Sequence, residues 1–228
     1  MKILFWDIDG TLMKTDRAGL FAFQQAVKEV LNADADFTSI KTAGMTDCYI
    51  AGEIIKMHKG REAKSHEITA LIKHYEELLP AHLAARKGKL MPYVRELLEH
   101  FHKRDDFISL LLTGNTSSGA TAKLTRYEIV QYFDFTISAF GDNCPDRLEL
   151  AADALSKATT RYPRITPKDM FVIGDTPNDI RCGKAINANT IAVATGSYSL
   201  EDLALHTPWW TVKTLPEPAE FEAKLMAN

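Results

Sequence analysis

Two aspartates, Asp7 and Asp9, stand immediately behind a short apolar stretch, Ile3–Trp6. Two carboxylates at the end of a buried strand repel each other and do not easily both stay ionised. A bound cation or a basic side chain is therefore expected nearby. An aspartate in this place can attack phosphorus as a nucleophile, and its neighbour can donate and accept protons. The simpler alternative is that Asp9 only begins a turn with Gly10, and that Asp7 is a solvated strand end.

Two further carboxylates, Asp175 and Asp179, follow a later apolar stretch in VIGDTPND. Asp175 lies directly at the predicted strand end, where it can share a cation with Asp7. Mg2+ is the cation typically bound by one or two carboxylates together with a substrate phosphate. Asp179 has a second interpretation, because Thr176, Pro177 and an acid two residues later are typical of a helix start. Asp179 is therefore either a member of the metal site or only a helix-capping residue.

A third polar group, in LLTGNT, follows another apolar stretch. Thr113 and Asn115 supply side-chain donors, and Gly114 leaves backbone N–H groups accessible. Uncharged donors suit the oxygens of a phosphoryl group. T-G-N by itself is more often a plain loop, so its place behind an apolar stretch supports the phosphate-binding interpretation.

Short apolar stretches of this kind recur along the chain, each followed by small polar residues. They occupy residues 2–11, 107–116, 133–143, 169–179 and 189–197. Apolar strands that alternate with helices are typical of a parallel sheet covered on both faces. Sites in such sheets form beyond the carboxyl ends of the strands. The sequence therefore predicts an α/β fold with a doubly wound, Rossmann-like parallel sheet, and places all three polar groups at one edge of it.

A long segment without a comparable strand separates the first two stretches. Its apolar residues recur at three- and four-residue spacing, which predicts helices at 18–31, 47–58 and 67–85. A crossover needs only about a dozen residues, so this segment is an insertion. We expect an inserted α-helical cap domain over residues 15–88 and a catalytic core over residues 1–14 and 89–228. A Pro-started amphipathic helix over 91–104 is expected to return the chain to the core.

The three polar groups, in this order, resemble the haloacid dehalogenase superfamily of phosphohydrolases over essentially the whole chain. Its D-x-D-G-T motif matches Asp7–Thr11, its strand-end Thr matches Thr113–Asn115, and its G-D-x-x-x-D motif matches Gly174–Asp179. The resemblance implies that Asp7 is the nucleophile and that Asp9 is the acid and base. It also implies Mg2+ held by the Asp7 carboxylate, the Asp9 backbone carbonyl and Asp175, with Asp179 in the same motif.

The remaining family motif departs from the pattern, because a Lys-Pro pair is expected there and this sequence has none. The matching region, FGDNCPDRLELA, offers Arg147 at a helix start. Arginine can hold phosphate through two parallel hydrogen bonds and so can replace lysine. The alternative is that Arg147 is an exposed helix residue and that Lys123 or Lys157 supplies the positive charge.

The inserted segment resembles the helical cap of the phosphoglycolate phosphatase-like branch, and AGMTD at residues 43–47 resembles its cap loop. Gly44, Thr46 and Asp47 are then expected to approach the substrate when the cap closes, which excludes water from the site. Equally, Thr46 and Asp47 can simply start the next helix.

The composition of the chain narrows the classes of partner that the protein is expected to bind. The chain has 27 basic and 30 acidic residues, a net charge of -3, and so lacks the broad positive field that nucleic acid requires. Cys48, Cys144 and Cys182 are odd in number and widely spaced, which indicates neither a disulfide framework nor a zinc site and favours a reducing compartment. No apolar run approaches the roughly 20 residues that span a bilayer. We expect a cytoplasmic protein without a membrane partner; its oligomeric state stays open.

Together these features predict a Mg2+-dependent phosphatase that hydrolyses a small phosphorylated metabolite through an aspartyl-phosphate on Asp7. A sugar phosphomutase of the same superfamily would use Asp7 and Asp9 in the same way. A catalytically inactive binding scaffold is the alternative from another class. The sequence does not identify the substrate.

Overall fold

A computed structural model describes residues 1–142 and 146–227 of the chain. Its centre is a five-stranded sheet in the order β4-β1-β5-β6-β7, in which every neighbouring pair is parallel. The strands are β1 (Lys2–Trp6), β4 (Phe107–Leu111), β5 (Met170–Gly174), β6 (Asn189–Val193) and β7 (Trp210–Val212). The chain places β4 on one side of β1 and the later strands β5, β6 and β7 on the other side. Parallel α/β sheets form their ligand sites at such a change of side.

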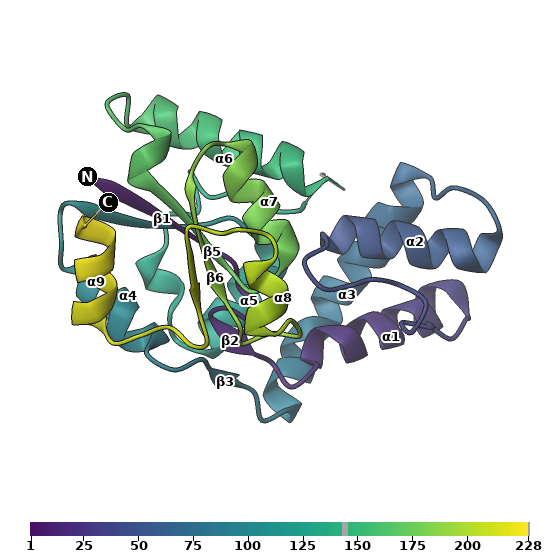
Figure 1. Ribbon diagram of the computed structural model, residues 1–228. Coiled ribbons are helices and arrows are strands. Elements are labelled where there is room, and N and C mark those ends of the chain that lie inside the picture. The colour runs from purple at the N-terminus through teal and green to yellow at the C-terminus, as the bar shows by residue number, and fades with distance from the viewer. Residues whose placement is uncertain (143–145, 228) are drawn as a thin grey trace.

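Helices cover both faces of this sheet (Figure 1). Alternate side chains of β1 explain the two layers: Leu4 and Trp6 belong to one apolar cluster, and Ile3 and Phe5 belong to another. Helices α4 (Val94–His102), α5 (Ser117–Arg126) and α9 (Pro218–Met226) contribute to the first cluster. Helices α6 (Arg147–Arg161) and α7 (Pro177–Ala185) contribute to the second. The remaining core elements are α8 (Leu200–Ala204), η1 (Val130–Tyr132) and η2 (Pro167–Asp169). This is the doubly wound, Rossmann-like core that the sequence predicts.

Three helices between β1 and β4 form a separate unit beside the sheet (Figure 1). They are α1 (Ala18–Leu31), α2 (Asp47–Lys59) and α3 (Ser65–Ala85), and they enclose an apolar cluster of their own. Within that cluster Phe23 stacks on Tyr75 with ring centroids 4.0 Å apart. A two-stranded antiparallel ribbon of β2 (Met13–Lys14) and β3 (Lys89–Leu90) carries the chain between the unit and the core.

Two local expectations are wrong, and one strand was not expected. Residues 133–142 form no strand, and only Ala139 bridges to Leu112 at the edge of the sheet. The Asp134 carboxylate accepts from the backbone N–H of Thr136 and holds this segment in a turn. Strand β7 was not expected. The helix of residues 91–104 begins only at Val94, because Tyr93 before it has a φ of 60°.

Residues 143–145, which include Cys144 and part of the FGDNCPDRLELA region, lie outside the described part of the chain. Within that part, no helix combines the length and the apolar character needed to cross a membrane.

Candidate active site

The carboxylates of Asp7, Asp175 and Asp179 converge at the carboxyl edge of the sheet. Asp7 follows β1 and donates its backbone N–H to Ile173 of the neighbouring β5, Asp175 follows β5, and Asp179 lies in the first turn of α7. Each offers an oxygen within 4.8 Å of the other two, and all three residues are buried. Parallel pairing of β1 with β5 therefore brings together side chains that lie 168 residues apart in sequence, from 7 to 175.

Burial and mutual repulsion strongly disfavour ionisation in this cluster. Burial is the largest cause that raises the pKa of Asp7 to about 7, and the Asp179 carboxylate adds to it. Burial likewise raises the pKa of Asp175 to about 9, followed by repulsion from Asp179 and Asp7. Carboxylates that resist ionisation in this way require a nearby positive charge to serve as anions at neutral pH.

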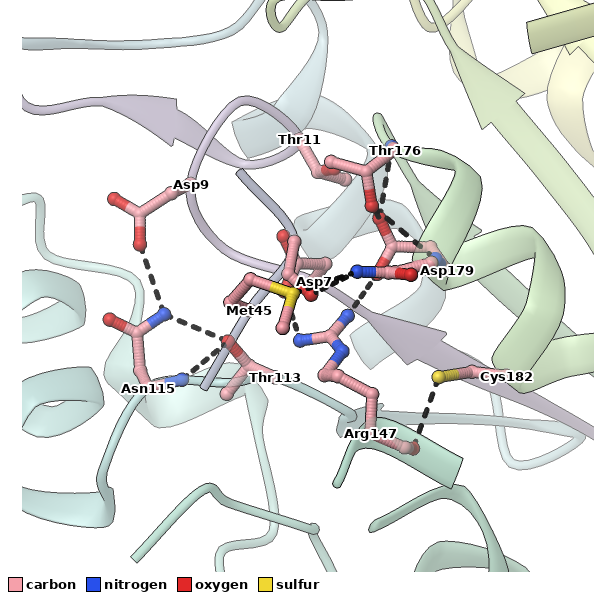
Figure 2. A network of polar contacts seen from close by, with 12 residues as sticks. Asp7, Asp9, Thr11, Met45, Thr113, Asn115, Arg147, Thr176, Asp179 and Cys182 are labelled. Carbon is pink, nitrogen blue, oxygen red and sulfur yellow. Dashed lines mark hydrogen bonds and ion pairs between the residues drawn. The ribbon is translucent and has the colours of Figure 1, made fainter. Parts of the chain in front are cut away.

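Arg147 supplies part of that charge (Figure 2). As the first residue of α6 it is only 6% exposed, and its guanidinium lies 3.6 Å from Asp7 Oδ1 and hydrogen bonds to Asp179 Oδ1. Burial lowers the pKa of Arg147, but the carboxylates of Asp179 and Asp7 outweigh that effect and raise it. Its buried Nε has no hydrogen-bond partner among the described residues. Lys157, in contrast, bonds to the Ser138 carbonyl and Asp153, outside the acidic cluster.

A second group of polar side chains surrounds Asp9. Asn115 donates from Nδ2 to Asp9 Oδ2 at 3.0 Å and to Thr113 Oγ1 at 2.8 Å. Lys123 of α5 donates to Asp9 Oδ2 and to Asn115 Oδ1. The Asp9 side chain is 46% exposed whereas that of Lys123 is 5% exposed. Lys123 therefore holds the Asp9 carboxylate from the buried side and leaves the other side of the carboxylate open.

The sequence interpretation treated Lys123 only as a substitute for Arg147, whereas the two side chains occupy different places. Burial lowers the pKa of Lys123, but the carboxylates of Asp9 and Asp47 outweigh it and the pKa is raised. One feature of the sequence could have indicated that Lys123 pairs with a buried acidic group. Lys123 shares the buried face of α5 with Gly119, Ala120 and Leu124, where an unpaired lysine would be costly.

Gly10 of the D-x-D-G-T motif makes room for Asp175. Its φ is +86°, and a Cβ placed there would lie 2.4 Å from Asp175 Oδ2. Thr11 donates to Asp175 Oδ1 at 3.3 Å, and Thr195 donates to the Gly10 carbonyl at 2.5 Å. The motif thus combines a conformation that favours glycine with a hydroxyl that orients the second carboxylate.

Both interpretations of Asp179 describe part of its surroundings. Its Oδ2 accepts from the backbone N–H of Thr176 at 3.0 Å, and the backbone N–H of Asp179 donates to Thr176 Oγ1 at 3.4 Å, which together form a capping box. Its Oδ1 faces Arg147. One oxygen therefore caps α7 and the other belongs to the acidic cluster.

The loop of residues 43–47 lies against the core. Asn178 donates to the Gly44 carbonyl at 2.8 Å, and the Asp47 N–H donates to the Gly114 carbonyl at 2.8 Å. Asp47 Oδ2 in turn accepts from the backbone N–H of Thr116 at 3.0 Å. Thr46 caps α2 through Tyr49, as its helix-start interpretation predicts.

A cavity of about 590 Å³ lies between the core and the helical unit. Its lining includes Asp7, Asp9, Asn115, Lys123 and Arg147 from the core, and residues of α1, α2 and α3 from the opposite side. The polar residues at the sheet edge therefore face a partly open cavity large enough for a small organic ligand.

Comparisons with known proteins agree with this geometry. The sequence profile of the haloacid dehalogenase-like hydrolases matches residues 1–187, and the chain belongs to that family of hydrolases. No curated protein sequence matches the chain significantly.

Solved structures of similar fold come from several organisms. A predicted phosphoglycolate phosphatase from Haemophilus somnus 129pt is 18% identical, with a TM-score of 0.71 over 100% of this chain and 98% of its own. CbbY from Rhodobacter sphaeroides, solved with phosphate, is 17% identical with a TM-score of 0.73 over 94% of both chains. A candidate β-phosphoglucomutase from Bacteroides vulgatus is 18% identical with a TM-score of 0.72 over 100% and 89%. At these identities the likeness shows a shared fold.

Proposed function

We propose that this protein is a Mg2+-dependent phosphatase that hydrolyses a small phosphate monoester through an aspartyl-phosphate on Asp7. The convergence of Asp7, Asp175 and Asp179 beside the buried Arg147, with Asp9 facing the same cavity, is the observation that carries the proposal. Enzymes that transfer a phosphoryl group act chiefly by positioning it and by balancing its charge. Carboxylates, a guanidinium and neutral donors around one cavity suit that task.

In the first step an Asp7 oxygen bonds to phosphorus and the bond to the leaving alkoxide breaks. The alkoxide takes a proton from Asp9 and departs as an alcohol. In the second step Asp9, now ionised, takes a proton from a water molecule whose oxygen attacks the aspartyl-phosphate. Inorganic phosphate leaves and Asp7 is regenerated as a carboxylate.

The other side chains hold the reacting groups. Thr113 and Asn115 lie beside the phosphoryl site as neutral donors, and Arg147 offers a permanent charge to its oxygens. Lys123 and Asn115 fix the Asp9 carboxyl so that its open side faces the leaving group.

The acidic cluster fits Mg2+ in its donor chemistry. Its donors are all oxygens, and three carboxylates exceed the single charge of Arg147, so a hard divalent cation restores the balance. We assign the metal to the carboxylates of Asp7 and Asp175 and the backbone carbonyl of Asp9, with Asp179 adjoining. When bound, it would neutralise charge on the phosphoryl oxygens and on the carboxylates.

Residues 15–88 act in this proposal as a cap, and Gly44, Thr46 and Asp47 form its closing loop. The hydrogen bonds between this loop and Gly114, Thr116 and Asn178 support a position of the loop against the core, from which it would limit the access of water.

One observation favours a phosphomutase as a second candidate. The same closed loop would protect a phosphorylated Asp7 from water until a second sugar hydroxyl accepts the phosphoryl group, and the similar fold from Bacteroides vulgatus is described as a candidate mutase. A mutase isomerises a sugar phosphate and releases little phosphate, so the reaction products distinguish a mutase from a phosphatase.

The test measures phosphate release from acetyl phosphate and from a panel of phosphorylated metabolites, with Mg2+ and with EDTA. Wild-type protein should release phosphate only with Mg2+, and Asp7→Asn should release none because an amide is a poor nucleophile and an uncharged ligand. Asp153→Asn, a half-exposed carboxylate on α6, is the matched control and should behave as wild type. Release by a folded Asp7→Asn protein would refute the assignment. If wild type neither releases phosphate from any compound nor isomerises a sugar phosphate, a scaffold is favoured.

A further inference from the structure

The leaving group of a substrate must lie on the Asp9 side of the phosphoryl site, because Asp9 is the residue proposed to protonate it. Lys123, which clamps Asp9, marks that side. A Cβ placed on Gly19, the second residue of α1, would lie 3.9 Å from Lys123 Nζ and 3.5 Å from the Tyr75 hydroxyl. Gly19, Tyr75 and Lys123 are therefore close neighbours, and all three line the cavity that Asp9 also lines.

Aromatic rings form the wall beyond this point. Tyr75 stacks on Phe23 at 4.0 Å with an angle of 18° between the rings, and Phe23 meets Phe37 edge to face at 6.5 Å. All three rings line the same cavity as Asp9. We call the space bounded by Gly19, Phe23, Phe37, Tyr75 and Lys123 the ring chamber. Its wall is apolar except for one hydroxyl and one ammonium group.

Lys123 and Arg147, the two buried cations of the cavity lining, are already paired, whereas Lys14 and Arg17 line the same cavity from exposed positions. Lys123 bonds to Asp9 and Asn115, and Arg147 faces Asp7 and Asp179. A carboxylate buried inside the ring chamber would meet aromatic rings and an ammonium group that is already paired, and burying an unpaired charge is costly. A small acidic leaving group such as glycolate would also leave the apolar wall uncovered.

We propose that the ring chamber selects phosphate monoesters whose alcohol carries a flat, uncharged, apolar ring one or two bonds from the ester oxygen. This inference rests on the proposed phosphatase function and narrows its substrate class. The ring would pack against the aromatic wall formed by Phe23 and Tyr75, and a polar substituent on the ring would hydrogen bond to the Tyr75 hydroxyl. The cavity of about 590 Å³ has room for such a ring together with the phosphate.

Binding of phosphonates tests the chamber without turnover, because their carbon–phosphorus bond resists this chemistry. Calorimetry on wild-type protein with Mg2+ compares benzylphosphonate with methylphosphonate. Burial of the ring should tighten binding about 10- to 100-fold. Equal or weaker binding of benzylphosphonate would overturn the ring chamber.

Gly19→Leu tests its position, because a leucine side chain would project between Tyr75 and Lys123 and fill the space. Leucine is a better helix former than glycine, so α1 should be retained. The expected result is at least about a tenfold fall in the preference for benzylphosphonate over methylphosphonate, since the ring is then excluded. Gly52→Leu on α2 is the control: its Cβ would meet Ile68 Cδ1 at 3.6 Å, outside the cavity lining, and the preference should stay as in wild type.

Turnover separates this inference from the proposed function. Benzyl phosphate and ethyl phosphate release alcohols of similar acidity, so a higher kcat/KM for the benzyl ester reports the chamber and not the leaving-group chemistry. Preferential binding of benzylphosphonate without hydrolysis of either ester or of acetyl phosphate would refute the phosphatase and support the chamber. Hydrolysis without a benzyl preference would support the phosphatase and overturn the chamber. If Gly19→Leu fails to fold, the phosphonate comparison in wild type still decides.

Discussion

Replacing Arg147 with methionine removes the only side-chain cation in direct contact with the acidic cluster within the described residues. Arg147 lies 3.6 Å from Asp7 Oδ1 and pairs with Asp179, and its side chain is 6% exposed. Methionine keeps most of the length and apolar contact of the arginine stem. The substitution therefore isolates the charge, and leaves three buried carboxylates without compensation.

The cost follows from these distances. At an effective dielectric constant of about 20, a 3.6 Å separation corresponds to an attraction of about 5 kcal/mol. Removing one partner of a buried ion pair generally costs about 3–5 kcal/mol. We expect Arg147→Met to lower the free energy of unfolding by that amount at pH 8 in EDTA, where the carboxylates are driven to ionise.

The loss of unfolding free energy in Arg147→Met should change with pH in a defined direction. Burial raises the pKa of Asp7 to about 7, and Arg147 opposes that rise, so its removal raises the pKa further. A carboxyl with a raised folded pKa stabilises the fold least at high pH, because the folded state then gives up a proton that it binds more tightly than the unfolded chain does. The difference between variant and wild type should therefore be about 1–3 kcal/mol smaller at pH 6 than at pH 8.

The assay is urea unfolding followed by circular dichroism, at both pH values, with EDTA and with Mg2+. Mg2+ should restore part of the stability of the variant, because it supplies the missing positive charge. Arg181→Met, on the exposed face of α7, should change the unfolding free energy by less than about 0.5 kcal/mol. A loss below about 1 kcal/mol for Arg147→Met at pH 8, or one equal to that of Arg181→Met, would refute this account of the cluster.

Three other predictions follow from the same site. The melting temperature of the metal-free protein should fall from pH 5 to pH 9 as Asp7 and Asp175, with pKa values raised to about 7 and about 9, are forced to ionise; Mg2+ should reverse the fall, and calorimetry checks this. Asp175→Ala should weaken the apparent Mg2+ affinity in activity titrations more than Asp179→Ala, since one Asp179 oxygen caps α7; the opposite order would exchange their roles. Asp9→Asn should slow turnover of p-nitrophenyl phosphate by about two to four orders of magnitude after a burst of nitrophenol, and an unimpaired rate would exclude it as acid and base.

The elements that could be predicted are those whose local pattern agrees with their burial. The helix predicted over 18–31 is α1, and the strands β1, β4, β5 and β6 lie within the predicted apolar stretches. These elements are buried on one or both faces, and such burial gives the apolar residues a regular spacing in the sequence. The family and the fold class are confirmed on that basis. Strand β7 is three residues long and half-buried, so it leaves no such pattern.

The prediction of a strand over 133–143 failed for a different reason. Its alternating apolar residues are typical of a strand, but Asp134 bonds to the Thr136 N–H and its carbonyl accepts from Ser138. Aspartate and serine offer the backbone such local partners in competition with a sheet ladder. Only Ala139 is left to continue the pairing.

The partners of the site residues depend on the tertiary fold in a way that no local pattern records. Lys123 lies eight residues beyond Asn115 and 114 residues beyond Asp9, and it meets both only because α5 packs behind the end of β1. The spacing of the sequence shows that a lysine lies on the buried face of α5. It does not show which carboxylate that lysine reaches.

The acidic cluster also differs in its energetics from carboxylates that are paired with cations elsewhere in this protein. Hydrogen bonds from Arg61 and Lys59 hold the pKa of Glu67 well below its usual range. Hydrogen bonds from His100 and Arg104 lower the pKa of Glu222. Those pairings stabilise the fold when ionised. Asp7 and Asp175 have raised pKa values instead, so ionisation there opposes folding. Burial also raises the pKa of Asp47, which lines the same cavity, to about 6. Carboxyl groups with raised pKa values around one cavity, beside favourably paired carboxylates elsewhere, indicate a place kept for a ligand that carries positive charge.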